Sequence, residues 1–92
     1  MRIVVTRAAK RDLTAIRAYI GERNPAAASR IAVQLLAAFD RLEYLPERGR
    51  PGVEPGTREI TTIWPYVIVY RITATTVEIL RVWHGAQDRQ SE

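Results

Sequence analysis

The stretch YVIVYRITATTVEILRVWH, residues 66–84, decides how the C-terminal half of this chain folds. Two runs rich in β-branched and aromatic residues, Tyr66–Ile72 and Thr76–His84, flank the short segment 73–75. This pattern is typical of two strands joined by a tight turn. A third run of the same kind, Thr57–Ile63, precedes them, so we expect a three-stranded antiparallel meander.

The segment before the meander, residues 47–56, contains three glycines and two prolines. This composition predicts a turn-rich loop between a helix and the sheet. A phosphate-binding loop would need a Gly-Lys-Ser/Thr sequence that opens a helix, and the segment has neither feature.

The N-terminal half predicts a helical hairpin. Thr6 is the expected N-cap of a first helix from Arg7, whose apolar residues recur at helical spacing at Ala9, Leu13, Ile16 and Ile20. Asn24-Pro25 restarts the chain as a second helix, because asparagine caps well and proline is tolerated at the first helical position. The apolar stripe of that helix consists of Ala28, Ile31, Leu35, Phe39, Leu42 and Leu45, and Pro46 ends it.

The first residues, Arg2–Thr6, are mostly β-branched and apolar. We expect a short strand here that is buried on both faces. The whole chain, residues 1–92, is then one α+β domain. Its N-terminal strand and helical hairpin pack on the C-terminal meander.

A turn centred on residues 74 and 75 sets the expected register of the last two strands. One face then carries the pairs Tyr70 with Ile79, Ile68 with Arg81, and Tyr66 with Trp83. The other face carries Val67, Val69, Leu80 and Val82. Both faces are largely apolar, and two helices cover only one of them, so the uncovered face predicts a macromolecular partner.

Composition excludes several classes of protein. No run approaches the roughly 18 apolar residues of a membrane span, and the short apolar run at the N-terminus does not predict a signal peptide. With no cysteine and a single histidine, we expect no disulfide, no metal site and no other cofactor. A cytoplasmic location fits best.

The chain is basic, with a net charge of +4, and thirteen of its fourteen basic residues are arginine. The planar guanidinium suits phosphate, carboxylate and aromatic partners. A genome rich in G and C also raises arginine at the expense of lysine, so the sequence leaves both explanations open.

Three arginines and the histidine are candidates for chemistry. Arg71 falls opposite Glu78, so a cross-strand ion pair accounts for it. Histidine is the side chain most often used for acid or base catalysis, so His84 is a candidate, although a hydrogen-bonding cap at the strand end is the more common role.

Arg81 is the arginine that the expected register places on an apolar face, beside Tyr66 and Trp83. Since an unpaired buried guanidinium is costly, Arg81 is either partnered or open to a ligand, and Arg58 on the neighbouring strand could complete a basic patch. The two tryptophans, Trp64 and Trp83, are expected in the core.

Taken in order, the helical hairpin, the Leu45-Pro46 exit and the segments 49–52, 56–60, 66–72 and 79–89 resemble the RelE/ParE superfamily of bacterial toxins. The resemblance spans nearly the whole chain. It implies a RelE/ParE-like fold and the toxin half of a type II toxin–antitoxin pair. It also implies neutralisation by a cognate antitoxin, ParD-like or similar.

The superfamily implies two alternative activities. RelE-like members cleave mRNA on the ribosome, and this chain keeps four candidate nuclease residues: Arg58, Arg71, Arg81 and His84. It has no tyrosine after Tyr70 and no lysine after Lys10. ParE-like members instead poison DNA gyrase, and the long hairpin with the His84-Gly85 ending is more similar to them.

We therefore expect a gyrase-directed toxin with a role in plasmid stabilisation, and keep a ribosome-dependent endoribonuclease as the alternative. The residues expected to contact the target or the antitoxin are Arg58, Tyr66, Tyr70, Arg81, Trp83, His84 and Arg89. The arginine excess and the aromatic-bearing sheet leave a third alternative, a non-catalytic nucleic-acid-binding module.

Overall fold

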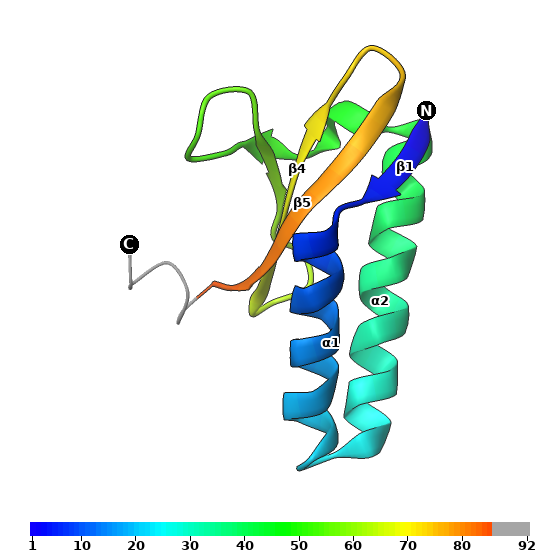
Figure 1. Ribbon diagram of the computed structural model, residues 1–92, viewed down its shortest axis with the longest axis vertical. Helices are drawn as coiled ribbons and strands as arrows, with labels where there is room; N and C mark the ends of the chain where they lie inside the picture. The colour runs from blue at the N-terminus through cyan, green and yellow to red at the C-terminus, as the bar shows by residue number, and fades with distance from the viewer. Residues whose placement is uncertain (86–92) are drawn as a thin grey trace.

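The computed structural model describes residues 1–85, which form two helices on one face of a mixed five-stranded sheet (Figure 1). The elements are β1 (Arg2–Val5), α1 (Arg7–Gly21), α2 (Pro25–Tyr44), a 3₁₀ helix (Pro46–Arg48), β2 (Arg50–Pro51), β3 (Arg58–Ile60), β4 (Tyr66–Ile72) and β5 (Thr76–His84). The strand order is β1-β5-β4-β3-β2, with β1 parallel to β5 and the other pairs antiparallel. The α+β class and the packing of the hairpin on the meander are confirmed.

Both predicted helix starts are confirmed. The Thr6 hydroxyl accepts the Ala9 N–H at 3.2 Å, and the Asn24 side chain accepts the Ala27 N–H at 3.0 Å. Each cap satisfies a backbone N–H that has no partner within its helix. Leu45 was wrongly placed on the apolar stripe: α2 ends at Tyr44, and Leu45 is 62% exposed.

The core lies between the helices and one face of the sheet. It consists of Ala9, Leu35, Ala38, Phe39, Leu42, Ile60, Tyr66, Ile68, Tyr70, Val77, Ile79 and Val82. The far end of the hairpin extends past the sheet (Figure 1). None of the helices within residues 1–85 combines the length and hydropathy of a bilayer span.

Three strand predictions need correction. β1 is half-buried, because it forms one edge of the sheet and is not covered on both faces. β3 is shorter than the predicted run 57–63. The predicted loop 47–56 contains the other edge strand, β2, whose two residues are too few to show a strand pattern.

A β-bulge in β5 changes which side chains face the core. Tyr70 pairs with Ile79 as expected, but the register then shifts, so Val69 pairs with Arg81 and Ile68 with Val82. The predicted pairs of Ile68 with Arg81 and of Tyr66 with Trp83 are wrong by one residue, because the extra residue of a bulge reverses the alternation beyond it.

The consequence is an exchange of faces. Val82 turns into the core, where it is 3% exposed. Arg81 and Trp83 move with Val69 to the face of the sheet away from the helices, which we call the open face.

Candidate functional site on the open face

Arg81 is held by a carboxylate from the first helix. Its Nε donates to Oδ2 of Asp12 at 2.7 Å and its Nη2 to Oδ1 at 3.0 Å. The guanidinium carbon also lies 4.2 Å from the centre of the Trp83 ring, within cation–π range. The sequence left Arg81 either partnered or open to a ligand, and the structure shows that it is partnered.

Asp12 also completes the sheet where β1 ends. β1 stops at Val5, so the edge of β5 beyond Ile79 has no neighbouring strand. The Val82 N–H donates to Oδ2 of Asp12 at 2.9 Å instead. Asp12 is not among the site residues predicted from the sequence. The available signal was that it is the sole acid of α1 and lies beside the apolar stripe position Leu13.

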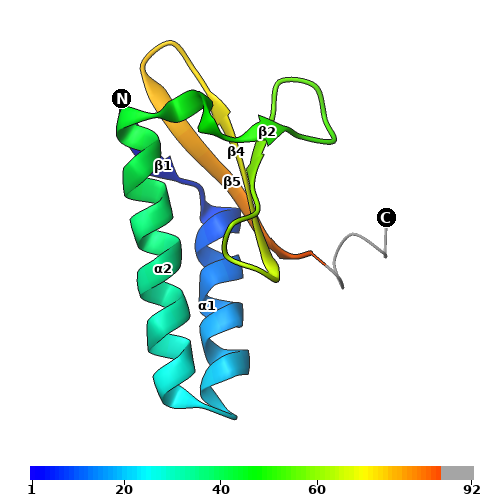
Figure 2. The ribbon, with the colours of Figure 1, turned by 180° about the vertical axis from the view of Figure 1, so that it is seen from behind.

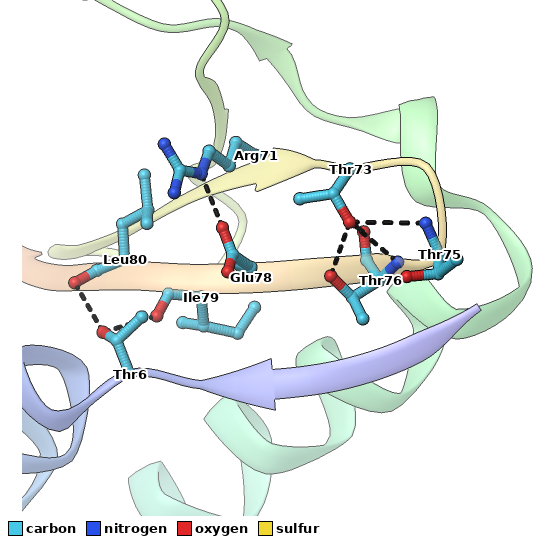
Figure 3. A network of polar contacts seen from close by, with 8 residues as sticks. All are labelled: Thr6, Arg71, Thr73, Thr75, Thr76, Glu78, Ile79 and Leu80. Carbon is cyan, nitrogen blue, oxygen red and sulfur yellow. Dashed lines mark hydrogen bonds and ion pairs between the residues drawn. The ribbon is translucent and has the colours of Figure 1, made fainter.

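Thr6 supports the bulge from the same side. Its hydroxyl lies 2.8 Å from the carbonyl oxygen of Ile79 and 3.1 Å from that of Leu80 (Figure 3). The bulge is therefore fixed by two residues of the first helix: its N-cap Thr6 contacts Ile79 and Leu80, and Asp12 in its second turn contacts Val82. This bracing sets the direction of Arg81.

The loop between β2 and β3 projects from the sheet on the side of the open face (Figure 2) and covers part of that face. Loop and sheet enclose a hollow of about 350 Å³, lined by Val53, Glu54, Thr57, Glu59, Val69, Leu80, Arg81 and Trp83. Glu59 is 4% exposed and accepts from Arg50 at 3.1 Å. The hollow thus offers two carboxylates and one guanidinium that is already paired.

Tyr70 and Arg58 hold the segment that follows α2. Tyr70 is fully buried; its hydroxyl donates to the Pro46 carbonyl at 2.6 Å and accepts the Gly49 N–H at 2.9 Å. Burial raises the pKa of Tyr70, although the Gly49 N–H and nearby Arg58 oppose the rise. Arg58 Nη1 donates to the carbonyls of Glu47 at 3.1 Å and Gly49 at 2.9 Å.

Residues 3–89 match the family described as ParE toxin of type II toxin-antitoxin system, parDE. The chain belongs to this family. It is a type II toxin of the RelE/ParE superfamily, as the resemblance implied.

Individual relatives carry names from both branches. Toxin RelE1 of Caulobacter vibrioides is 41% identical over 90 residues, which cover 95% of this chain and 96% of that toxin. The chromosomal ParDE system of P. aeruginosa superposes with a TM-score of 0.83 at 27% identity, covering 91% of this chain and 95% of the other. The toxin–antitoxin complex RelBE2 of Mycobacterium tuberculosis gives 0.61 at 31%, covering 90% and 95%.

This ParE-family toxin does not bring its four candidate nuclease residues together. Arg58 pairs with Tyr70 across β3 and β4, and His84 pairs with Tyr66 across β4 and β5, so both belong to the helix-covered face. Arg71 and Arg81 belong to the open face, because directly opposed residues share a face.

Each of the other candidates has a local contact. Arg71 forms the predicted ion pair with Glu78, Nε to Oε1 at 2.6 Å (Figure 3). The His84 ring meets the Tyr66 ring edge-on, with centroids 5.7 Å apart. Burial, and secondarily Tyr19, raises the pKa of Tyr66.

The remaining predicted residues are the two tryptophans and Arg89. Trp64 is 71% exposed and Trp83 is on the open face, so neither takes the predicted place in the core. Arg89 lies outside the described residues. Within residues 1–85, no three side chains of His, Asp or Glu gather as a metal site requires.

Proposed function

We propose that this toxin acts without chemistry of its own, by binding DNA gyrase and blocking its cycle. The observation that carries the proposal is the bidentate hold of Asp12 on Arg81. Phosphodiester cleavage needs cations and a proton-transfer group within about 3 Å of one reacting centre. In this toxin Arg58, Arg71 and Arg81 each bind a partner within the protein. Arg58 lies on the helix-covered face of the sheet, whereas Arg71 and Arg81 lie on the open face.

The alternative is a ribosome-dependent endoribonuclease, favoured by the relative named RelE1. In that mechanism His84 would transfer the proton and Arg58, Arg71 and Arg81 would stabilise the phosphate. The edge-on contact of His84 with Tyr66 favours a packing role instead.

A cognate antitoxin is the second proposed partner, and the helical hairpin offers it a surface. A hollow of about 180 Å³ lies between α1 and α2, lined by Leu13, Thr14, Ile16, Arg17, Ala28, Ala32, Leu35 and Leu36. Leu36 is 53% exposed there and neighbouring Val33 is 66% exposed. A groove between two helices suits the apolar face of a third, so we propose that the antitoxin docks a helix here in the cytoplasm.

The test is to induce the toxin in bacteria and record which failure comes first. A gyrase-directed toxin induces the DNA-damage response before protein synthesis falls, and the variant His84→Ala still kills when it folds. Early translation arrest that disappears in the folded His84→Ala variant would favour the nuclease instead.

A further inference from the structure

The positive charge of this protein is concentrated on α1. This helix holds four basic residues and one acidic residue, a net charge of +3, whereas α2 holds two of each and is neutral. The entire chain carries only +4. One helix of 15 residues therefore accounts for most of the net charge.

The four cations lie on one face of the helix. At about 100° per residue, Arg7, Lys10, Arg11 and Arg17 fall within an arc of about 120°, opposite the core-facing Ala9. All four are exposed. We call these four residues the basic stripe. The other residues of α1 on that arc are small: Thr14, Ala18 and Gly21.

The stripe is not neutralised by the surrounding protein. The one carboxylate of α1, Asp12, turns to Arg81 on the sheet. Among residues 1–85, no carboxylate forms an ion pair with any of the four stripe residues. Their positive charge is thus directed to solvent, unlike that of the engaged arginines of the sheet.

The spacing of the stripe suits a duplex. From Arg7 to Arg17 the helix rises about 15 Å. One strand of a duplex carries a phosphate about every 3.4 Å along its axis, so about four phosphates fall within that length. The small residues Thr14 and Ala18 allow the helix to approach the phosphates closely.

A protein partner fits this face less well. The cores of protein interfaces are depleted in charged residues and combine arginine with aromatic anchors, and the stripe contains no aromatic or large apolar side chain. The exposed Tyr19 lies on another side of α1, and the exposed Leu36 belongs to α2. Contacts to a phosphate backbone need only cations and hydrogen-bond donors.

We propose that the basic stripe of α1 binds the sugar-phosphate backbone of a nucleic-acid duplex, without reading its sequence. The surface is distinct from the open face, shares only Arg17 with the groove between the helices, and does not depend on which target the toxin poisons. At physiological salt the dissociation constant is then about 10⁻⁴ to 10⁻⁶ M, as for other non-specific backbone contacts.

The experiment is a salt titration of the free toxin with a fluorescent DNA duplex of about 20 base pairs, followed by anisotropy between about 50 and 200 mM salt. Four phosphate contacts predict a slope of log K against log salt of about −3.6. The double variant Arg11→Gln/Arg17→Gln halves that slope. The matched control is Arg30→Gln/Arg41→Gln, which removes the same charge from α2 and retains the full slope.

Two further arms identify the ligand. An RNA duplex of the same sequence also has a sugar-phosphate backbone and is expected to bind with an affinity within a few fold of that of DNA. A larger difference in affinity would identify the preferred duplex as DNA or RNA. A polyglutamate peptide of similar length is expected to bind more weakly than either. The proposal is overturned by equal losses in both double variants, by the absence of a salt slope in the folded wild type, or by tighter binding of the peptide.

Discussion

Asp12 and Arg81 are 69 residues apart in the sequence, and they form a two-point ion pair that ties the first helix to the last strand. The same carboxylate accepts the Val82 N–H. One side chain therefore pairs a charge and closes an exposed strand edge next to the bulge.

Removing this carboxylate is expected to destabilise the fold. Because hydrogen bonds to charged groups contribute about 1.5–3 kcal/mol and Arg81 is partly exposed, Asp12→Ala should lower the free energy of unfolding by about 1–2 kcal/mol. Asp12→Asn should cost less, since its amide oxygen still accepts the Val82 N–H. Urea unfolding measures both, and equal stability of Asp12→Ala and wild type would contradict the role of Asp12.

The control for this prediction is the exposed pair of Arg71 with Glu78. Arg71→Ala should cost no more than about 1 kcal/mol, because solvent screens exposed ion pairs.

Tyr70→Phe should lower stability by about 1–3 kcal/mol, because it leaves the Gly49 N–H and the Pro46 carbonyl without their buried partner. The same variant tests how Tyr70 makes the free energy of unfolding depend on pH. Burial raises the pKa of Tyr70 above its ordinary value of 10.0, so its contribution is full below that pH and is lost as the pH rises through the folded pKa.

Urea unfolding of wild type and Tyr70→Phe at neutral and strongly alkaline pH checks the sign. Stability should fall less steeply with pH in the variant, and Tyr66, whose pKa burial also raises, should retain part of the decline. An identical alkaline decline in both proteins would rule out Tyr70 as its source.

Gly49 should not tolerate a side chain. A Cβ there would lie 2.6 Å from the Tyr70 hydroxyl and 2.9 Å from the Glu59 carbonyl oxygen, neither of which has room to move. Gly49→Ala is expected to cost about 1–3 kcal/mol through overpacking. Gly21→Ala is the matched control, since its Cβ would meet Ala28 at an ordinary 3.9 Å, and calorimetry should show no loss of stability there.

The proposed antitoxin groove can be tested by charge. Leu36→Glu places a carboxylate in the apolar hollow between the helices and should weaken antitoxin binding by at least about tenfold, or 1.4 kcal/mol. Leu45→Glu changes a leucine that is also exposed but lies beyond the end of α2, and it should leave the affinity unchanged in titration calorimetry. Equal affinities of both variants would exclude the groove.

Much of the fold could be predicted, because its signals are local. Thr6 and Asn24 each precede a helical pattern that they cap, and Tyr66–Ile72 and Thr76–His84 are the observed strands. Such capping and alternation act over a few residues, so the sequence contains them in readable form.

The candidate site could not be predicted in the same way. The run Ile79-Leu80 puts two apolar residues in succession, so alternation did not locate the bulge at Leu80, and everything beyond it was assigned to the wrong face. The partner of Arg81 comes from another element 69 residues away, and only the folded chain brings Asp12 to it.

Supercoiling of relaxed plasmid by purified gyrase, with increasing amounts of folded toxin, measures directly whether DNA gyrase is the target. Supercoiling is expected to stop or cleaved plasmid to accumulate, the antitoxin should reverse the effect, and His84→Ala should still inhibit. Undiminished supercoiling at micromolar toxin, together with His84-dependent cleavage of mRNA on ribosomes, would contradict gyrase as the target.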